Sequence, residues 1–371
     1  MYVYNLLVHL RFWVLAGTLI LLSHVAGAFP VPLPGTEDIP KLMASATLVC
    51  KGEVNAAPTP VSVPTGAGMP NMTATAFVHP DRCFKGDPHG SSVPVLFDGF
   101  VASVSPSFVL RKGDYRLFFL KPHGTLYEVV NVWFGALRIS RELGSTPDGA
   151  HSMQLLELDL KAGLRDADPE RVLDSVRMLG NMKHLRSKTE LAALLQTSDL
   201  LVKTYVWQAL LRLKDYSIMP QIEAFFATQP EAPHELSLPR DRLFYMQYEI
   251  AREIGQIRDA NTLPYLQRFA ESDKHYLRTH AIDALRAIGS PESAAVYLKQ
   301  LDDSDPQIAF SAMHALIELS GGGPIAWVPT LPEFLEAPQF YEAKCREWWL
   351  TEGRSKASTR MPLGHTNLFP Q

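Results

Sequence analysis

The sequence predicts an α+β multidomain protein in which a small N-terminal β-barrel or β-sandwich is followed by an α-helical solenoid. The first observation is a helical pattern that occurs twice, over 277–289 and again over 308–320. The second is the residue pattern over 42–143, where short apolar runs alternate with turns rich in Gly, Pro and Asp. Such runs are typical of small sandwiches and barrels, and a repeated helical pattern is typical of a solenoid.

The two helical copies match at a constant offset of 31 residues. The matched pairs are Leu277 with Ile308, Ala281 with Ala312, Ala284 with Ala315, Leu285 with Leu316, and Ile288 with Leu319. A fixed offset of this size indicates stacked helical hairpins, with the small residues placed where neighbouring helices approach closely. A weaker copy, Val202–Leu213, precedes the first at an offset of 75.

The first 28 residues have the pattern of a secretory signal. Arg11 provides a positive flank, Phe12–Leu22 is uninterruptedly apolar, and Ala26-Gly27-Ala28 offers the small side chains that a signal peptidase reads. We expect cleavage after Ala28 and an exported, periplasmic or secreted protein with no stable membrane span. The alternative is a signal retained as an anchor, although the apolar run is short for a span of about 20 residues.

The domain boundaries follow from these changes of pattern. We expect a signal peptide over 1–28, a proline-rich linker over 29–41, the β-domain over 42–143, a linker over 144–167, the solenoid over 168–320, an aromatic C-terminal cap over 321–350 and a disordered tail over 351–371.

The β-domain resembles a known secreted module. The similarity rests on Ala46-x-Leu48-Val49-x-Lys51-Gly52-x-Val54, on Phe84-Lys85-Gly86-Asp87, and on the run from Leu110 to Leu120. Together they resemble the OB-type barrel of netrin-like and metalloproteinase-inhibitor domains. Those inhibitors chelate a protease metal through an amino-terminal cysteine, whereas the new terminus here is Phe29. The resemblance therefore implies the fold without implying inhibition.

The helical region resembles HEAT-like repeats of the short kind found in phycobilisome lyase-type proteins. Its most specific element is Asp-x-x-x-Leu-Arg-x-x-Ala-x-x-Ala-Leu-x-x-Ile-Gly, from Asp273 to Gly289, and the resemblance covers Asp168 to Leu319. It implies a helical array suited to protein–protein interaction, and it implies no particular activity.

Cys50 and Cys83 lie in neighbouring predicted strands, where they form either a disulfide or two buried thiols. Cys345 has no such neighbour, and the spacing of the three cysteines fits no zinc template. His280 and His314 occupy non-equivalent positions in the two repeats, and the His234-Glu235 dipeptide occurs once, in a proline-rich insertion. We therefore expect no metal site.

The composition argues against several other functions. The formal net charge is −4, with 35 basic and 39 acidic residues mixed along the chain, so we expect no nucleic-acid partner. No Gly-x-Ser-x-Gly elbow or phosphate-binding loop is present. We expect no catalytic residues and no cofactor.

Two surfaces are candidates for binding. Arg278 and Arg286 could form a basic edge of the solenoid, which is otherwise an ordinary solvated helix face. Trp348 and Trp349 belong to an aromatic segment that either closes the end of the solenoid or forms an exposed docking site.

The expected function is that of an exported, non-enzymatic scaffold that binds a protein or peptide partner on the concave face of the solenoid. One alternative is a degenerate lyase-like enzyme, which would lose activity on substitution of His280 or His314. Another is a protease-inhibitor-like β-domain, which inhibition assays on a chain starting at Phe29 would reveal.

Overall fold

The computed structural model describes residues 37–58, 61–62, 73–88, 90–98, 100–101, 109–183, 185–229, 243–322 and 327–358. The chain divides into two compact units, Met1–Met182 and Lys183–Gln371. The expected signal peptide, its cleavage site at Ala28 and the His234-Glu235 dipeptide lie outside the described residues.

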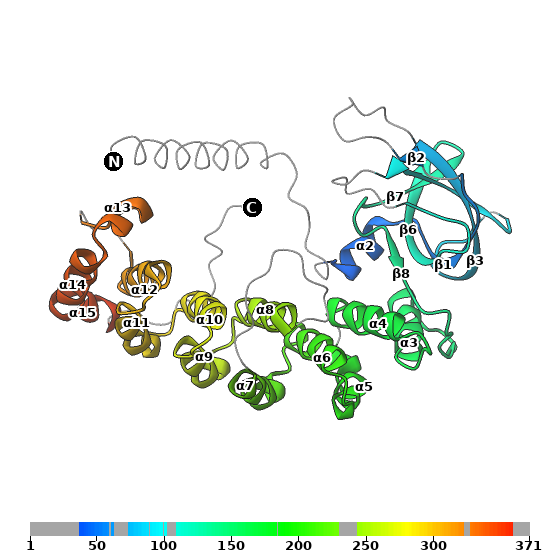
Figure 1. Ribbon diagram of the computed structural model, residues 1–371. Helices are drawn as coiled ribbons and strands as arrows, with labels where there is room; N and C mark the ends of the chain where they lie inside the picture. The colour runs from blue at the N-terminus through cyan, green and yellow to red at the C-terminus, as the bar shows by residue number, and fades with distance from the viewer. Residues whose placement is uncertain are drawn as a thin grey trace, which may run out of the picture. The chain divides into compact units, whose positions relative to one another are not determined.

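The first unit contains a closed five-stranded β-barrel (Figure 1). Its strands are β1 (Leu48–Ala56), β3 (Thr73–Lys85), β4 (Val93–Asp98), β6 (Tyr115–His123) and β7 (Leu126–Val129). They are ordered β1-β3-β4-β7-β6, and β6 pairs back with β1. The β4–β7 pair is parallel and the other pairs are antiparallel. Strand β8 (Ala136–Arg138) extends the sheet beside β6, and the short β2 (Val61–Ser62) and β5 (Phe100–Val101) pair separately.

Alternate residues of each strand fill the barrel. Leu48 and Val54 of β1 join Phe118 of β6 in one apolar core. The intervening side chains Val49 and Phe119 are also fully buried, although they belong to the opposite face of their strands. Burial on both faces explains why β6 carries a continuous apolar run.

Strands β1 and β3 approach each other closely at Gly52. A Cβ atom at this position would lie 2.1 Å from the carbonyl oxygen of His79 on β3. No side chain fits at that distance, so the glycine permits the crossing of the two strands.

Three α-helices lie in the described part of the first unit: α2 (Ile39–Ser45), α3 (Ser152–Gly163) and α4 (Pro169–Asn181). Helix α2 begins within the expected proline-rich linker, and α3 occupies half of the expected 144–167 linker. Helix α4 starts where the solenoid was expected to start, yet it groups with the barrel. Ion pairs connect both helices to the β-domain, since Asp159 of α3 pairs with Lys51 of β1 and Asp174 of α4 pairs with Arg138 of β8.

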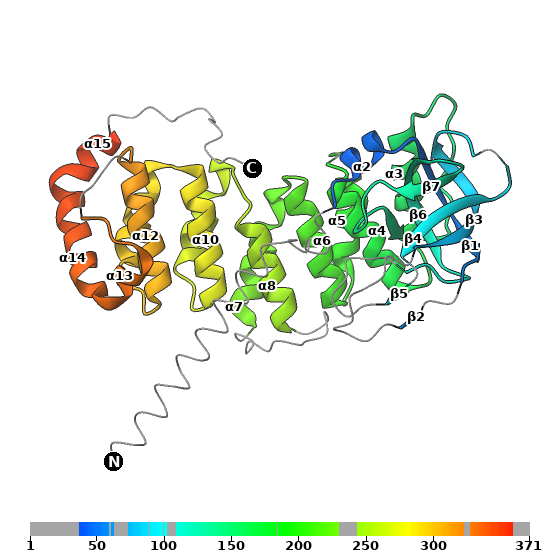
Figure 2. The same ribbon diagram turned by 90° about the horizontal axis from the view of Figure 1, so that it is seen from above.

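The second unit is an array of paired helices. Its helices before the C-terminal segment are α5 (Lys188–Ala193), α6 (Leu200–Arg212), α7 (Met219–Thr228), α8 (Leu243–Ile254), α9 (Leu263–Ala270), α10 (His275–Ile288), α11 (Ala294–Gln300) and α12 (Pro306–Leu319). Helices α6, α8, α10 and α12 lie side by side in one layer, and α7, α9 and α11 form the other layer (Figures 1 and 2). The fold class predicted from the sequence, a small β-domain followed by a helical solenoid, is therefore confirmed.

The residues matched between the two helical copies occupy equivalent buried positions. Ala281 and Ala312 are fully buried, as are Leu285 and Leu316. The small alanine side chains lie where α10 and α12 pack against their neighbours, as the periodicity predicts.

The C-terminal segment closes the array with α13 (Leu331–Glu336), α14 (Pro338–Trp348), a π-helical turn (Trp349–Gly353) and α15 (Arg354–Ser358). Helical structure therefore continues beyond residue 350, where the disordered tail was expected to begin. No helix in the described ranges has both the length and the apolar character needed to cross a bilayer.

Candidate functional site on α8, α10 and α12

Polar and aromatic side chains form a connected row along the outward sides of three neighbouring helices. We call this row the ladder face and define it by Tyr248 and Arg252 of α8, His280, Asp283 and Arg286 of α10, and His314 and Glu318 of α12. Positions three or four residues apart share one side of a helix, so each helix presents its members together.

Contacts between helices connect the row. The Tyr248 and His280 rings meet edge to face with their centroids 5.9 Å apart. The Arg286 guanidinium donates to both carboxylate oxygens of Glu318, at 2.6 and 3.1 Å. These contacts hold the side chains of α8, α10 and α12 in a defined arrangement.

An ion-pair cluster lies beneath the α8 end of the ladder face. Glu253 accepts a 2.5 Å hydrogen bond from Arg212 of α6, and Glu249 pairs with Arg252. Both glutamates are 8% exposed, and burial raises the pKa of the Glu249 carboxyl above its usual value, against the opposing effect of Arg252. The cluster joins α6 to α8 and fixes the backbone that carries Tyr248.

Both histidines of the ladder face are partly buried and electrostatically disfavoured as cations. Burial is the main cause that lowers the pKa of His280, and Arg252 adds to the effect. Burial likewise lowers the pKa of His314, whose Nε2 has no hydrogen-bond partner among the described residues. The nearby carboxylates of Asp283 and Glu318 oppose these shifts. Each imidazole is thus held neutral near pH 7.

We expect the second unit to lose stability as the pH falls below about 6.5, the ordinary histidine pKa. The unfolded chain binds protons there that the folded histidines resist, so acid favours unfolding. Urea unfolding between pH 7.5 and 5.5, followed by amide exchange in α10 and α12, measures the effect. The pH dependence should shrink in a His280→Gln/His314→Gln double variant, and an unchanged dependence would assign it to other groups.

The structure separates the four residues proposed as an interaction surface. Arg286 lies on the ladder face, with its side chain 28% exposed. Arg278 is only 14% exposed, because its guanidinium binds both carboxylate oxygens of Asp303 at 2.7 and 3.1 Å. Arg278 therefore fastens α10 to the loop after α11.

The two tryptophans form part of the terminal cap. Trp348 and Trp349 are 7% and 3% exposed, and their rings lie against Gly353, where a Cβ would come within 2.8 Å of the Trp349 ring. Little of either indole is available to a partner. The exposed aromatic ring of this segment is instead that of Phe340, at 58%.

The cysteines fall into two classes. Cys50 and Cys83 face each other across β1 and β3 and form a disulfide. Cys345 is free and fully buried, and burial raises the pKa of its thiol to about 12. A thiol with so high a pKa is a poor nucleophile at neutral pH.

The sequence analysis missed a buried ion cluster in the first unit. Lys51 of β1 lies 2.9 Å from Asp159 of α3, both side chains are fully buried, and Arg82 of β3 pairs with the same carboxylate. Burial lowers the pKa of Lys51 despite the neighbouring Asp159. The unusual signal in the sequence is a lysine within an apolar strand, but nothing local identifies its partner 108 residues away.

No group of three or more His, Cys, Asp or Glu side chains in the described part of the chain is arranged to hold a metal ion.

Comparison with known proteins identifies the class of the helical unit. Residues 237–317 match the family model for HEAT repeats, a range that runs from before α8 into α12 and includes every ladder-face residue except Glu318. No curated protein is similar enough to the chain to count as a relative. The second unit therefore contains HEAT repeats, a class that commonly mediates protein interactions.

Proposed function

We propose that this chain is an exported, non-enzymatic scaffold that binds a protein or peptide partner through the ladder face of its HEAT repeats. The observation that supports it is the connected row of side chains on α8, α10 and α12, within the matched repeats. Stacked helical repeats provide such extended binding surfaces because each repeat adds a few residues to the same side.

The chemistry of the ladder face suits a polypeptide. Tyr248 is 39% exposed, and tyrosine and arginine are the residue types that most often dominate the energy of protein interfaces. The charges of the face are of both signs, and Arg286 and Glu318 pair with each other. A partner would therefore be recognised by shape, aromatic contact and hydrogen bonds, with a weak dependence on salt.

We expect Tyr248→Ala to weaken capture of the partner by about tenfold or more, since loss of a central aromatic contact costs about 1–2 kcal/mol or more. The measurement is affinity capture from exported fractions with the wild type, followed by titration of the captured protein against each variant. Phe340→Ala is the matched control, because Phe340 is also exposed but lies on α14. Equal weakening by both variants, or by neither, would contradict binding at the ladder face.

The disulfide supports export. Disulfides persist in oxidising compartments and are rare in a reducing cytosol, so a Cys50–Cys83 bridge suits a chain released outside the cytoplasm. An exported form that begins at Phe29, detected by amino-terminal sequencing, tests cleavage after Ala28. A chain retained with its first residues in a membrane fraction would contradict it.

The barrel supports an OB-type, netrin-like assignment for the first unit. A closed five-stranded barrel of mostly antiparallel strands is the architecture of OB folds. The disulfide, however, joins two strands of the barrel itself, so inhibition through a free amino-terminal cysteine is not part of the proposal.

A degenerate lyase-like enzyme on the repeats is the second candidate, and the neutral imidazoles of His280 and His314 are the feature that favours it. A neutral imidazole is able to act as a general base. Catalysis abolished by His280→Gln, with partner capture retained, would replace the scaffold proposal with this one.

A further inference from the structure

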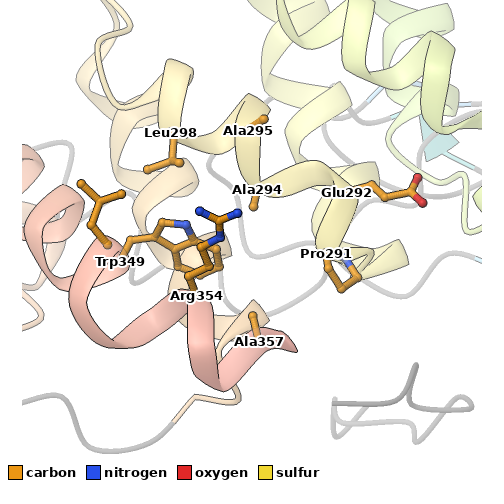
Figure 3. Close-up of a pocket in the computed structure, with 9 residues that line it drawn as sticks. Pro291, Glu292, Ala294, Ala295, Leu298, Trp349, Arg354 and Ala357 are labelled. Atoms are coloured by element: carbon orange, nitrogen blue, oxygen red, sulfur yellow. The ribbon is translucent and has the colours of Figure 1, made fainter. Parts of the chain in front are cut away.

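A groove runs between α11 and the C-terminal helical segment, away from the ladder face. It encloses about 310 Å³, and its apolar walls are formed by Ala294, Ala295, Leu298, Trp349, Leu350 and Ala357. Figure 3 shows the Trp349 indole and the Arg354 guanidinium pointing from the C-terminal segment toward α11. The volume is sufficient for a few apolar side chains.

The groove has a physical origin in the way the array ends. Helices α7, α9 and α11 form one layer, and a further repeat would cover the outer side of α11 with another helix (Figure 1). In this structure no such helix is described next to α11, and the π-helical turn Trp349–Gly353 places Trp349 along only one side of the space that it would fill. Leu350 consequently stays 70% exposed at the groove wall, the most exposed large apolar side chain among the described residues.

The chain itself provides a segment of suitable length and chemistry. The described structure ends at Ser358, one residue after Ala357 of the groove, and residues 359–371 follow. These 13 residues, Thr-Arg-Met-Pro-Leu-Gly-His-Thr-Asn-Leu-Phe-Pro-Gln, contain Met361-Pro362-Leu363 within five positions of Ser358. Five extended residues reach about 16 Å, so this triplet is able to return to a groove beside Ala357.

The segment also suits the groove in conformation and charge. Pro362 and Pro370 disfavour a helix and favour an extended backbone, the form in which proline-containing peptides bind aromatic-lined grooves. Residues 359–371 contain no Asp or Glu, and Arg360 precedes the apolar triplet. The lining of the groove provides one exposed carboxylate for it, that of Glu292, in addition to the guanidinium of Arg354.

We propose that this groove is the docking site of the chain's own residues 359–371, with Met361-Pro362-Leu363 against Leu298 and Leu350. Docking covers the apolar end of the helical array, as a terminal repeat with a polar outer face does in other solenoids. It is independent of partner binding at the ladder face.

Limited proteolysis of the full chain tests this docking. Trypsin cuts after Arg360, and the rate of that cut follows the fraction of time for which the segment is undocked. We expect Leu350→Glu to accelerate release of residues 361–371 by about tenfold, because a carboxylate in the apolar wall disfavours docking. Leu335→Glu is the matched control, since Leu335 is 46% exposed on α13 and does not line the groove. It should leave the rate unchanged.

Two results would overturn the proposal. Equal release rates in the wild type and in Leu350→Glu would show that the groove does not hold the segment. Protection that rises with protein concentration would show that the groove takes the segment of a second copy. Both substitutions are at exposed positions, so we expect the helices to stay intact. Circular dichroism of both variants checks this.

Discussion

Replacing Asp159 by Asn should destabilise the first unit by about 3–5 kcal/mol, the usual cost of breaking a buried ion pair. Asp159 forms the ion pair with Lys51, and both side chains are fully buried. The lysine also donates to the carbonyl oxygen of Glu142 at 2.5 Å, but a carbonyl does not neutralise its charge. Arg82 would lose its charged partner at the same time.

Urea unfolding of the full chain, followed by amide exchange in β1 and α3, measures this loss. Glu53→Gln is the control, because Glu53 lies on the same strand and pairs with Arg141 at the surface, with side chains 38% and 45% exposed. An exposed pair contributes about 1 kcal/mol or less. A Lys51→Met/Asp159→Leu double variant should recover much of the stability, and equal losses in Asp159→Asn and Glu53→Gln would contradict the cluster's role.

Removing the disulfide should destabilise the first unit by about 3–4 kcal/mol, the value expected for a closed loop of this size. The bridge joins residues 33 apart in sequence, and Cys50 is 3% exposed in the barrel core. A Cys50→Ser/Cys83→Ser variant should therefore unfold at a lower urea concentration, as should the wild type in dithiothreitol. The reductant should have no effect on the double variant. A wild type indifferent to reductant would show that the bridge contributes little.

The fold was predictable because its signals are local and periodic. The 31-residue offset matched positions that the structure buries together, such as Ala281 with Ala312. Turn residues between short apolar runs predicted a β-domain, and β6 was recognisable from its apolar run. Each of these patterns depends only on whether a residue is apolar, small or turn-forming. A single sequence shows this directly at every position.

The boundaries between units were less predictable. Helix α3 was expected to be a linker and α4 to belong to the solenoid, but both group with the barrel. Asp159 and Asp174 account for this through ion pairs with Lys51 and Arg138. A helical period shows that a segment is amphipathic and leaves open which surface it packs against.

The roles of the candidate site residues were likewise only partly predictable from the sequence. Trp348 and Trp349 were open to either a cap or a docking role, and their burial against Gly353 favours the cap. Arg278 and Arg286 are alike in sequence, yet Arg278 binds Asp303 beneath the surface and Arg286 reaches the ladder face. The exposure of each arginine side chain depends on the residues that contact it in the fold, and these cannot be identified from the adjacent sequence.

The sequence by itself determined the architecture: a β-domain followed by stacked helical repeats, because apolar periodicity and turn residues specify elements and their faces. Only the tertiary structure decided which charges are buried together, which thiols are joined and which side chains form the ladder face. Those relations connect residues as distant as Lys51 and Asp159, and they arise only when the folded chain brings both into a space from which water is excluded.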